Sequence, residues 1–261
     1  MKDADKGGVI VTAAARGTGL AVEQSAARNG YGVVIGDIDE AAGTKAKQFI
    51  QTSGGRTIFC KVDATDRSSV AAAVTACETE LCFLHGMVNN AGFNRPMPFL
   101  ETTEENWSQI MAVNGLGVLI DMQEAGEAMI ATGHKGKIIS TASKAGRAGF
   151  GDFAPYCASK ASVISLIQAA AKALAPHGVT VNAFAPGVVE TDLWVTLDRD
   201  PMEMGATSAL SQAIKDFTAG IPLGRASRPE NISGTVNFLL SPSSDYMTGQ
   251  CLMIDGGMIM Q

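Results

Sequence analysis

Tyr156 and Lys160 have types and a spacing that indicate chemistry. They stand four positions apart in an Ala-rich segment of helical character, so both side chains lie on one face of a helix. A phenol has an ordinary pKa of about 10 and is a poor base at neutral pH, but a neighbouring ammonium favours the phenolate and lowers that pKa. The pair predicts a tyrosine that takes a proton from an alcohol or returns one to a carbonyl. Because any helix can carry Tyr and Lys at this spacing, the prediction needs support from other residues.

Ser143 and Asn114 are two further polar residues in suitable places. Ser143 lies 13 residues before Tyr156 in the loop after a predicted strand, where its hydroxyl would hold a substrate oxygen. An ordinary turn serine is the alternative. Asn114 stands within a long predicted helix, where Asn is a poor helix former. It would satisfy backbone groups at a helix break and hold a water for proton relay, or be a kink residue beside Gly115.

A glycine-containing loop near the N-terminus predicts a phosphate-binding site. The segment Thr12-Ala-Ala-Ala-Arg-Gly-Thr-Gly19 follows a predicted strand and opens a predicted helix. Gly17 and Gly19 let the backbone approach a ligand closely. The helix N-terminus that follows supplies free N–H groups and a partial positive charge, which suit a pyrophosphate. A plain tight turn is the alternative.

Two acidic residues lie at the ends of the next two predicted strands, Asp37 as the last residue of one and Asp63 directly after the other. Asp37 comes about 20 residues after the glycines, where a carboxylate accepts hydrogen bonds from adenosine ribose hydroxyls and repels a 2′-phosphate. This position favours NAD over NADP, although Arg16 would offset part of the repulsion and Asp37 could instead be a turn residue. Asp63 would bind the adenine amino group or merely begin a loop.

Short β-branched strands alternate with longer Ala-rich helices along the whole chain. The predicted strands span residues 9–12, 32–37, 57–62, 85–89, 137–140, 179–184 and 251–254, and the predicted helices span 19–29, 40–52, 68–80, 103–131, 155–175 and 229–240. Strands this short and apolar are typical of a parallel sheet covered by helices. The pattern predicts an α/β fold, a doubly wound seven-stranded parallel sheet of the Rossmann type with helices on both faces, in one domain over residues 1–261.

Residues 190–223 interrupt this alternation between the sixth strand and the last helix. Long irregular insertions in compact domains are often lids or binding loops. We therefore expect a substrate-binding loop or lid at about 190–223. The residues expected to form the substrate wall are Phe150, Phe153, Val188, Trp194 and Leu197, with ordinary loop packing as the alternative.

Composition excludes several classes of protein. The net charge of −6 argues against a nucleic-acid-binding surface and gives no sign of a membrane partner. Five irregularly spaced cysteines argue against a disulfide framework, and no metal-ligand set is visible. The polar N-terminus has no signal peptide, and no apolar stretch reaches the roughly 18 residues of a membrane span. We expect a cytoplasmic protein that binds a small molecule and no metal.

In order and spacing, these motifs resemble the short-chain dehydrogenase/reductase superfamily over nearly the whole chain. Thr12 to Gly19 resembles the family's TGxxxGxG, Asn89-Asn-Ala-Gly92 its NNAG, Tyr156 to Lys160 its YxxxK and Pro186-Gly187 its PG. Ser143 and Asn114 occupy the positions of the family's catalytic serine and asparagine. Thr191 matches the threonine that meets the nicotinamide carboxamide and phosphate.

The resemblance implies an oxidoreductase in which hydride passes between C4 of a nicotinamide and the substrate's carbinol carbon. Tyr156 would be the general acid/base, and Lys160 would lower its pKa and bind the nicotinamide ribose. Ser143 would orient the substrate oxygen, and Asn114 would keep a relay water near Lys160. The implied cofactor contacts are Thr12, Arg16, Gly17, Thr18, Gly19, Asp37, Asp63, Asn90, Ala91, Gly92, Tyr156, Lys160, Pro186, Gly187, Val189 and Thr191. Ser143, Ala145 and Tyr156 join the wall residues as substrate contacts. The family usually assembles as homotetramers through the helices that hold Asn114 and Tyr156.

Two positions depart from the family pattern. Ala13 replaces the first glycine of the loop, and its methyl group weakens cofactor binding if the backbone there needs a positive φ. Lys144 directly follows Ser143, where the family more often has a small or apolar residue. With Arg147 and Arg95 it could contact an anionic or polyhydroxylated substrate, but a solvated loop lysine is the expectation.

The leading hypothesis is an NAD(H)-dependent dehydrogenase or carbonyl reductase of a polyol, sugar or other small secondary alcohol. A 3-oxoacyl-thioester reductase that uses NADPH is the alternative within the enzyme class, and Asp37 speaks against it. A non-catalytic nicotinamide-binding scaffold is the alternative outside it. Such proteins often lose the tyrosine or the lysine, and both are present here.

Overall fold

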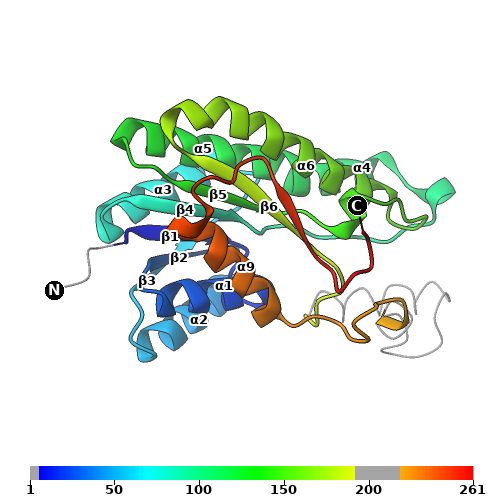
Figure 1. Ribbon diagram of the computed structural model, residues 1–261, viewed down its shortest axis with the longest axis horizontal. Helices are drawn as coiled ribbons and strands as arrows, with labels where there is room; N and C mark the ends of the chain where they lie inside the picture. Colours follow the sequence, from blue (N-terminus) through cyan, green and yellow to red (C-terminus); the bar gives the residue numbers. More distant parts are fainter. Residues whose placement is uncertain (1–5, 192–217, 261) are drawn as a thin grey trace.

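A computed structural model describes residues 6–191 and 218–260 and contains one sheet of seven parallel strands. The strands are β1 (Gly8–Thr12), β2 (Gly32–Asp37), β3 (Thr57–Lys61), β4 (Leu84–Asn89), β5 (Lys137–Thr141), β6 (Thr180–Pro186) and β7 (Cys251–Ile254). Their order across the sheet is β3-β2-β1-β4-β5-β6-β7. Helices cover both faces (Figure 1), so the predicted doubly wound Rossmann fold is confirmed.

The helices form two layers that bury separate apolar cores. One layer consists of α1 (Gly17–Arg28), α2 (Glu40–Thr52) and α9 (Pro229–Leu240), and the other of α3 (Arg67–Leu81), α4 (Glu104–Met111), α5 (Val118–Thr132) and α6 (Ala154–Leu174). Along β1, Val9 and Val11 pack into the core on one face and Ile10 into the core on the other. Every residue of β1 and β2 is buried, which explains their continuous apolar character. Within the described ranges, no helix combines the length and the apolar character that crossing a bilayer requires.

The strand order places the point where the winding reverses between β1 and β4. The chain runs outward from β1 through β2 to β3, and then returns to β4 on the other side of β1. Ligands of open parallel sheets bind in the crevice at the carboxyl ends of the strands at such a point. The segments that follow Thr12 and Asn89 therefore occupy the expected ligand crevice.

The predicted helix over residues 103–131 is present, and it is interrupted in the segment that contains Asn114 and its two internal glycines. The helix α4 ends at Met111, a π-helical segment spans Ala112–Gly117, and α5 begins at Val118. Two glycines weaken the α-helix in this segment, and the wider turn allows the Asn114 side chain to bond outside its own helix. Such π-bulges are frequent at functional sites.

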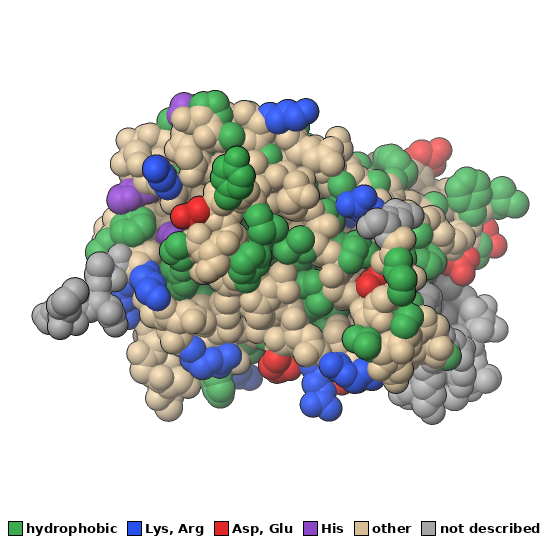
Figure 2. All heavy atoms as spheres, in the orientation of Figure 1, with side chains coloured by type: hydrophobic (Ala, Val, Ile, Leu, Met, Phe, Trp, Pro, Cys, Tyr) green, Lys and Arg blue, Asp and Glu red, His purple; other side chains and the backbone are tan. Residues whose placement is uncertain are grey.

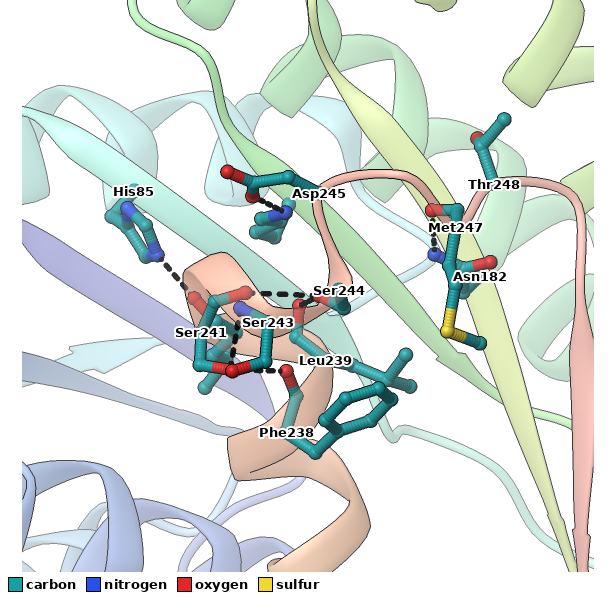
Figure 3. Close-up of polar contacts among 12 residues, drawn as sticks. His85, Asn182, Phe238, Leu239, Ser241, Ser243, Ser244, Asp245, Met247 and Thr248 are labelled. Atoms are coloured by element: carbon teal, nitrogen blue, oxygen red, sulfur yellow. Dashed lines mark hydrogen bonds and ion pairs between the residues drawn. The ribbon is translucent and has the colours of Figure 1, made fainter.

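The segment between α9 and β7 fastens the C-terminal part of the chain to the sheet (Figure 3). It includes the short helix η5 (Pro242–Ser244). A ring nitrogen of His85, at the start of β4, lies 2.8 Å from the carbonyl oxygen of Leu240. The Lys137 ammonium, at the start of β5, pairs with Asp245 at 2.6 Å. These contacts lie at the amino ends of the strands and leave the carboxyl-end crevice open.

Most of the predicted substrate loop at 190–223 lies outside the described residues, and so do Trp194 and Leu197. Its flanking segments run side by side, because Val189 and Ser227 form a parallel bridge. The Glu190 N–H donates to the Ser227 carbonyl at 2.9 Å. The remaining short helical turns are η1 (Phe99–Glu101), η3 (Lys144–Gly146) and η4 (Ala175–His177).

Candidate active site

A cavity of about 410 Å³ lies at the carboxyl ends of β1, β4, β5 and β6. The predicted site residues in its wall are Arg16, Gly17, Thr18, Asn90, Gly92, Ser143, Ala145, Phe150, Phe153, Tyr156, Lys160, Pro186, Gly187, Val189 and Thr191. The wall also contains residues that were not predicted as contacts, namely Ala13, Phe93, Asn94, Thr141, Ala142 and Lys144. The glycine loop and the Tyr156 segment therefore face the same space.

Tyr156 and Lys160 meet Ser143 at one side of this cavity. Both lie at the start of α6, and Ser143 precedes η3 after β5. Tyr156 and Ser143 share a side-chain hydrogen bond. The Ser143 hydroxyl also accepts from the Ala145 N–H at 3.1 Å. The Lys160 Nζ lies 5.7 Å from the centre of the Tyr156 ring and donates to the Thr141 carbonyl at 2.7 Å.

Burial governs the electrostatics of this group. It raises the pKa of Tyr156, while the hydrogen bond with Ser143 lowers it. Burial also lowers the pKa of Lys160 to about 8. Since Lys160 is only 3% exposed, little water screens its charge, and a protonated Lys160 acts strongly on the nearby phenol. The predicted lowering of the Tyr156 pKa by this ammonium and a cationic nicotinamide ring stays a prediction for the loaded site.

Asn114 lies behind the cavity wall and is fully buried. Its Oδ1 accepts from the Phe93 N–H at 3.0 Å, and its Nδ2 donates to the Phe93 carbonyl at 2.9 Å and to the Ser159 hydroxyl at 3.1 Å. A Cβ on Gly92 would lie 3.1 Å from Asn114 Oδ1 and 3.5 Å from Lys160 Nζ. Asn114 thus positions the segment that separates it from Lys160, and its predicted relay water stays a prediction.

The glycine loop presses closely against the NNAG segment. A Cβ on Gly19 would lie 2.6 Å from the Ala13 carbonyl oxygen and 2.8 Å from Asn90 Nδ2, so only glycine fits without a shift of the backbone. Asn90 Nδ2 donates to the carbonyls of Thr12 and Ala13, both at 3.1 Å. Gly17 has a φ of +56° and Ala13 a φ of +50°. Position 13 therefore does need the left-handed conformation that glycine adopts most easily.

Thr12 connects the glycine loop to the NNAG segment through hydrogen bonds of its side chain. Its hydroxyl accepts from the N–H groups of Asn90 and Ala91 at 3.0 and 3.1 Å, and donates to Asp121 Oδ2 at 3.4 Å. Asp121 is 1% exposed, and burial raises the pKa of its carboxyl group. The sequence reasoning missed this residue, although a lone acid in the apolar run Val118-Leu-Ile-Asp121 was an available signal.

Asp37 is fixed at the end of β2 by the backbone. Its Oδ2 accepts from the Ala15 N–H at 2.9 Å, and its Oδ1 accepts from the Asp39 N–H at 3.0 Å. Arg16 pairs with the Asp39 carboxylate. Asp39 also caps α2 by accepting from the Ala42 N–H at 3.0 Å.

Three more predicted contacts lie outside the cavity wall. Asp63 is exposed, and its carboxylate accepts from the N–H and hydroxyl of Thr65 at 2.9 and 2.7 Å. Val188 is 1% exposed and packs with Ile221 and Ala226 instead of facing the cavity. Gly19 supports the cavity through its contact with the loop rather than by lining it.

The expectation that Lys144 is a solvated loop lysine is wrong. Its side chain is buried, with the residue 8% exposed, and it lines the cavity. The Nζ lies 5.1 Å from the centre of the Phe150 ring and 3.4 Å from the Met258 sulfur. The turn η3 directs the residue after Ser143 inward. Arg147 and Arg95 are exposed and do not contribute to the cavity wall.

These residues fit a nicotinamide dinucleotide. The positive-φ turn, the space that a Cβ on Gly19 would fill and the N-terminus of α1 form a cradle for a pyrophosphate. The cavity extends from Arg16 to Tyr156, which allows the Gly loop to hold the phosphates while Lys160 and Thr191 meet the nicotinamide end. When bound, this cofactor supplies the hydride acceptor or donor.

Comparisons with known proteins agree with this geometry. Residues 12–259 match the family model described as Enoyl-(Acyl carrier protein) reductase. The chain is 36% identical over 252 residues to an L-2,3-butanediol dehydrogenase of Corynebacterium glutamicum, covering 96% of this chain and 97% of that protein. It is 38% identical over 256 residues to a galactitol 2-dehydrogenase of Agrobacterium fabrum, covering 95% of each chain.

Further similarity comes from a second curated relative and from a solved structure. A diacetyl reductase, (S)-acetoin forming, of Staphylococcus epidermidis is 36% identical over 250 residues, with 96% of this chain and 97% of that protein covered. The crystal structure of a short-chain type dehydrogenase/reductase from Mycobacterium marinum has a TM-score of 0.86 and 30% identity, and the match covers 98% of this chain and 96% of that one.

Fold and site define a Rossmann-fold oxidoreductase that uses a nicotinamide cofactor. The matches to the family model, the relatives and the solved structure cover nearly the whole length, and they show that the chain belongs to the short-chain dehydrogenase/reductase family. It is an oxidoreductase of the short-chain type that interconverts a secondary alcohol and a ketone. Neither the thioester reductase nor the non-catalytic scaffold is favoured by the relatives.

Proposed function

We propose that the protein is an NAD(H)-dependent dehydrogenase of a polyol, sugar or other small secondary alcohol. The observation that carries this proposal is the hydrogen bond between Tyr156 and Ser143 at the wall of a cavity that also receives the glycine loop. The relatives support a small substrate, because their names describe enzymes of butanediol, diacetyl and galactitol.

In this proposal Tyr156 moves the proton of the substrate hydroxyl. Ser143 holds the substrate oxygen beside the phenol, because its own hydroxyl is held by the Ala145 N–H. A protonated Lys160 stabilises the phenolate across the 5.7 Å to the Tyr156 ring and binds the nicotinamide ribose. Asn114 keeps a relay water near Lys160. Aligned donors and acceptors of this kind lower the barrier mainly by positioning the reacting groups.

The choice of NAD follows from charge at the end of β2. The Asp37 carboxylate uses one lone pair of each oxygen on the backbone and keeps others for ribose hydroxyls. A 2′-phosphate beside it would be repelled. Arg16, the cation that would offset this repulsion, pairs with Asp39. This arrangement supports NAD over NADP.

We further infer one domain that assembles as a cytoplasmic homotetramer. Apolar side chains remain exposed near the helices that hold the site, with Trp107 at 46% and Leu116 at 51% exposure, and the apolar C-terminal segment 255–261 offers a further contact. A monomer mass in light scattering would contradict the proposed homotetramer.

Two further observations bear on the compartment and the partner. All five cysteines are free thiols, which suits a reducing compartment. Lys and Arg side chains are dispersed on the face drawn in Figure 2, which supports a small-molecule partner rather than a nucleic acid.

The test is oxidation of a panel of diols, polyols and other secondary alcohols by the purified protein, followed as NADH or NADPH formation. We expect turnover with NAD at a higher kcat/KM than with NADP. Replacing Tyr156→Phe is expected to lower kcat by about 10²- to 10⁴-fold while NADH binding, measured by fluorescence, is retained. A Tyr156→Phe protein with wild-type kcat would contradict the proposed role, and a clear NADP preference would contradict the argument from Asp37.

A further inference from the structure

The amide oxygen of Asn94 is buried at the cavity wall. Asn94 is 8% exposed, and its Oδ1 has no hydrogen-bond partner among the described residues. Two other polar side chains of the same wall do have partners: the Asn90 amide donates to two carbonyls of the glycine loop, and the Ser143 hydroxyl accepts from a backbone N–H. Because a buried acceptor without a donor destabilises the fold, the Asn94 amide calls for a partner from the cavity.

The segment that carries Asn94 is held on both sides of this residue. Before it, the Asn114 amide accepts from the Phe93 N–H at 3.0 Å and donates to the Phe93 carbonyl at 2.9 Å. After it, the Arg95 carbonyl accepts from Asn106 Nδ2 at 3.3 Å. The backbone is therefore fixed around Asn94, as binding sites require of the residues that contact a ligand.

Contacts of the same segment place Asn94 at the substrate end of the cavity. The Met97 N–H donates to the Asp152 carbonyl at 2.9 Å, which ties this segment to the one that carries Phe150 and Phe153. Both aromatic residues line the cavity together with Asn94, and Phe153 directly precedes α6, the helix of the reacting tyrosine. A substrate that reacts at the start of α6 therefore shares its cavity with the Asn94 amide.

We propose that Asn94 binds a second hydroxyl group of the substrate, so that diols and the corresponding hydroxy ketones are preferred over simple secondary alcohols of the same size. An amide accepts a hydrogen bond through its oxygen and donates through its NH₂ group, and a hydroxyl can do both. The amide also turns readily about its last side-chain bond, so a hydroxyl can bond to whichever side faces the cavity. A hydrocarbon group at the same place would leave the amide unpaired. The inference rests on the proposed function, since it requires that a secondary alcohol reacts at Tyr156.

The experiment compares 2,3-butanediol and 1,3-butanediol with 2-butanol, which share a four-carbon skeleton and a secondary alcohol and differ in the second hydroxyl. We expect the wild-type protein to favour the better diol over 2-butanol in kcat/KM by at least about tenfold. The variant Asn94→Leu keeps the size of the side chain and is expected to lower this diol-to-butanol ratio by about tenfold or more, mainly through KM for the diol. The variant Asn94→Asp keeps the shape and an acceptor oxygen, and it is expected to retain more of the ratio than Asn94→Leu.

The variant Asn237→Leu is the matched control. Asn237 lies on α9 outside the cavity wall, and its amide oxygen is likewise buried with no partner in the described part of the chain. Its replacement is expected to leave the diol-to-butanol ratio unchanged. A second readout is the urea midpoint of Asn94→Leu without ligand, which we expect to be equal to or higher than that of the wild type, because no amide is left unpaired.

A further measurement uses the wild-type protein alone. In the direction of reduction, 3-hydroxy-2-butanone and 2-butanone differ by the same second hydroxyl. We expect KM for the hydroxy ketone to be lower by at least about tenfold. This comparison keeps the inference open to contradiction even if the Asn94 variants fail to fold.

Three outcomes would overturn the inference. Equal kcat/KM values of the wild type for the diols and 2-butanol, or equal KM values for the two ketones, would exclude a site for a second hydroxyl. Equal losses for diol and 2-butanol in Asn94→Leu would make Asn94 a structural residue. In each case the protein still oxidises a secondary alcohol, so the proposed function stays intact. Folded protein that binds NADH and oxidises no alcohol of either kind would overturn the proposed function itself.

Discussion

Ala13 shows how one side-chain methyl group conflicts with the backbone that surrounds it. Its φ of +50° lies in the left-handed region, which costs an L-residue about 1–2 kcal/mol. The conformation persists because neighbours fix it, with the Ala13 carbonyl accepting from Asn90 Nδ2 at 3.1 Å and Gly19 packed against the same oxygen. The loop therefore carries strain at the position where the family has glycine.

Replacing Ala13→Gly should relieve this strain. The gain is reduced by the larger entropy of glycine in the unfolded chain, so we expect the free energy of unfolding to rise by about 0.5–1 kcal/mol. Urea denaturation measures the change, and titration with NADH should give equal or tighter binding. The matched control is Ala14→Gly, whose fully buried alanine has no positive φ and should lose stability. A loss of stability in Ala13→Gly would show that the methyl packing outweighs the strain.

At the residue scale, the sequence was sufficient to predict those site residues whose type and spacing indicate a chemical role. Tyr156, Lys160 and Ser143 were predicted together, and the structure brings them to one wall. Lys144 and Asp121 were not, because the type of a residue does not reveal whether its side chain points inward. That direction depends on a single turn of η3 for Lys144 and on the distant Thr12 for Asp121.

At the scale of elements, the junction of α4 and α5 depends on contacts far along the chain. Asn114 bonds to Phe93 and Ser159, which lie 21 and 45 residues away. A periodic pattern of apolar residues cannot report such bonds, so the sequence predicted a helix break or kink beside Gly115 but not the π-helical segment. By contrast, the predicted bounds of β2, α2, α9 and β7 coincide with the observed ones, because local apolar runs, caps and glycines define them.

The variant Asn114→Ala tests what holds this junction. It leaves the N–H and carbonyl of Phe93 without their partner in a buried place, so we expect the free energy of unfolding to fall by about 2–4 kcal/mol. We also expect kcat to fall, because the Gly92 segment that Asn114 positions lies between Asn114 and Lys160. Thermal unfolding and steady-state kinetics measure the two effects.

A matched control separates these effects. Asn106 on α4 is 2% exposed and donates to the Arg95 carbonyl at 3.3 Å, away from the π-helical segment. The variant Asn106→Ala is expected to lose stability while kcat stays within about threefold of wild type. If Asn114→Ala kept the wild-type kcat as well, the junction would serve the fold alone.

At the scale of the whole molecule, several buried groups connect stability to pH. Burial raises the pKa of Asp121, and burial with the charge of Asp37 raises the pKa of Glu23. Burial lowers the pKa of Lys160 to about 8 and also lowers that of Lys144. The net charge of −6 predicts none of this, because it counts charges without showing which ones the fold removes from water.

The lowered pKa of Lys160 should make the free energy of unfolding depend on pH, and a denaturation experiment can isolate this effect. Its pKa is about 8 in the folded chain against an ordinary value of 10.5, so the unfolded chain binds more protons between these values. Stability therefore rises with pH in this window, and below it the fold bears the full cost of burying the ammonium, about 3 kcal/mol. The cost is lost as Lys160 gives up its proton, which is the reverse of the behaviour of a lysine that gains a partner on folding.

The variant Lys160→Met should remove this pH dependence along with turnover. We expect the variant to be the more stable protein at about pH 7, by an amount that the lost bond to the Thr141 carbonyl reduces. Between about pH 7 and pH 10, the free energy of unfolding of the wild type should then rise by about 2–3 kcal/mol relative to that of the variant, measured by urea denaturation of both proteins. The control Lys172→Met removes an exposed lysine of the same helix, and its free energy of unfolding should change with pH as that of the wild type does. Parallel curves for Lys160→Met and wild type would mean that the folded chain keeps the Lys160 charge throughout, and that the Thr141 carbonyl compensates for its burial.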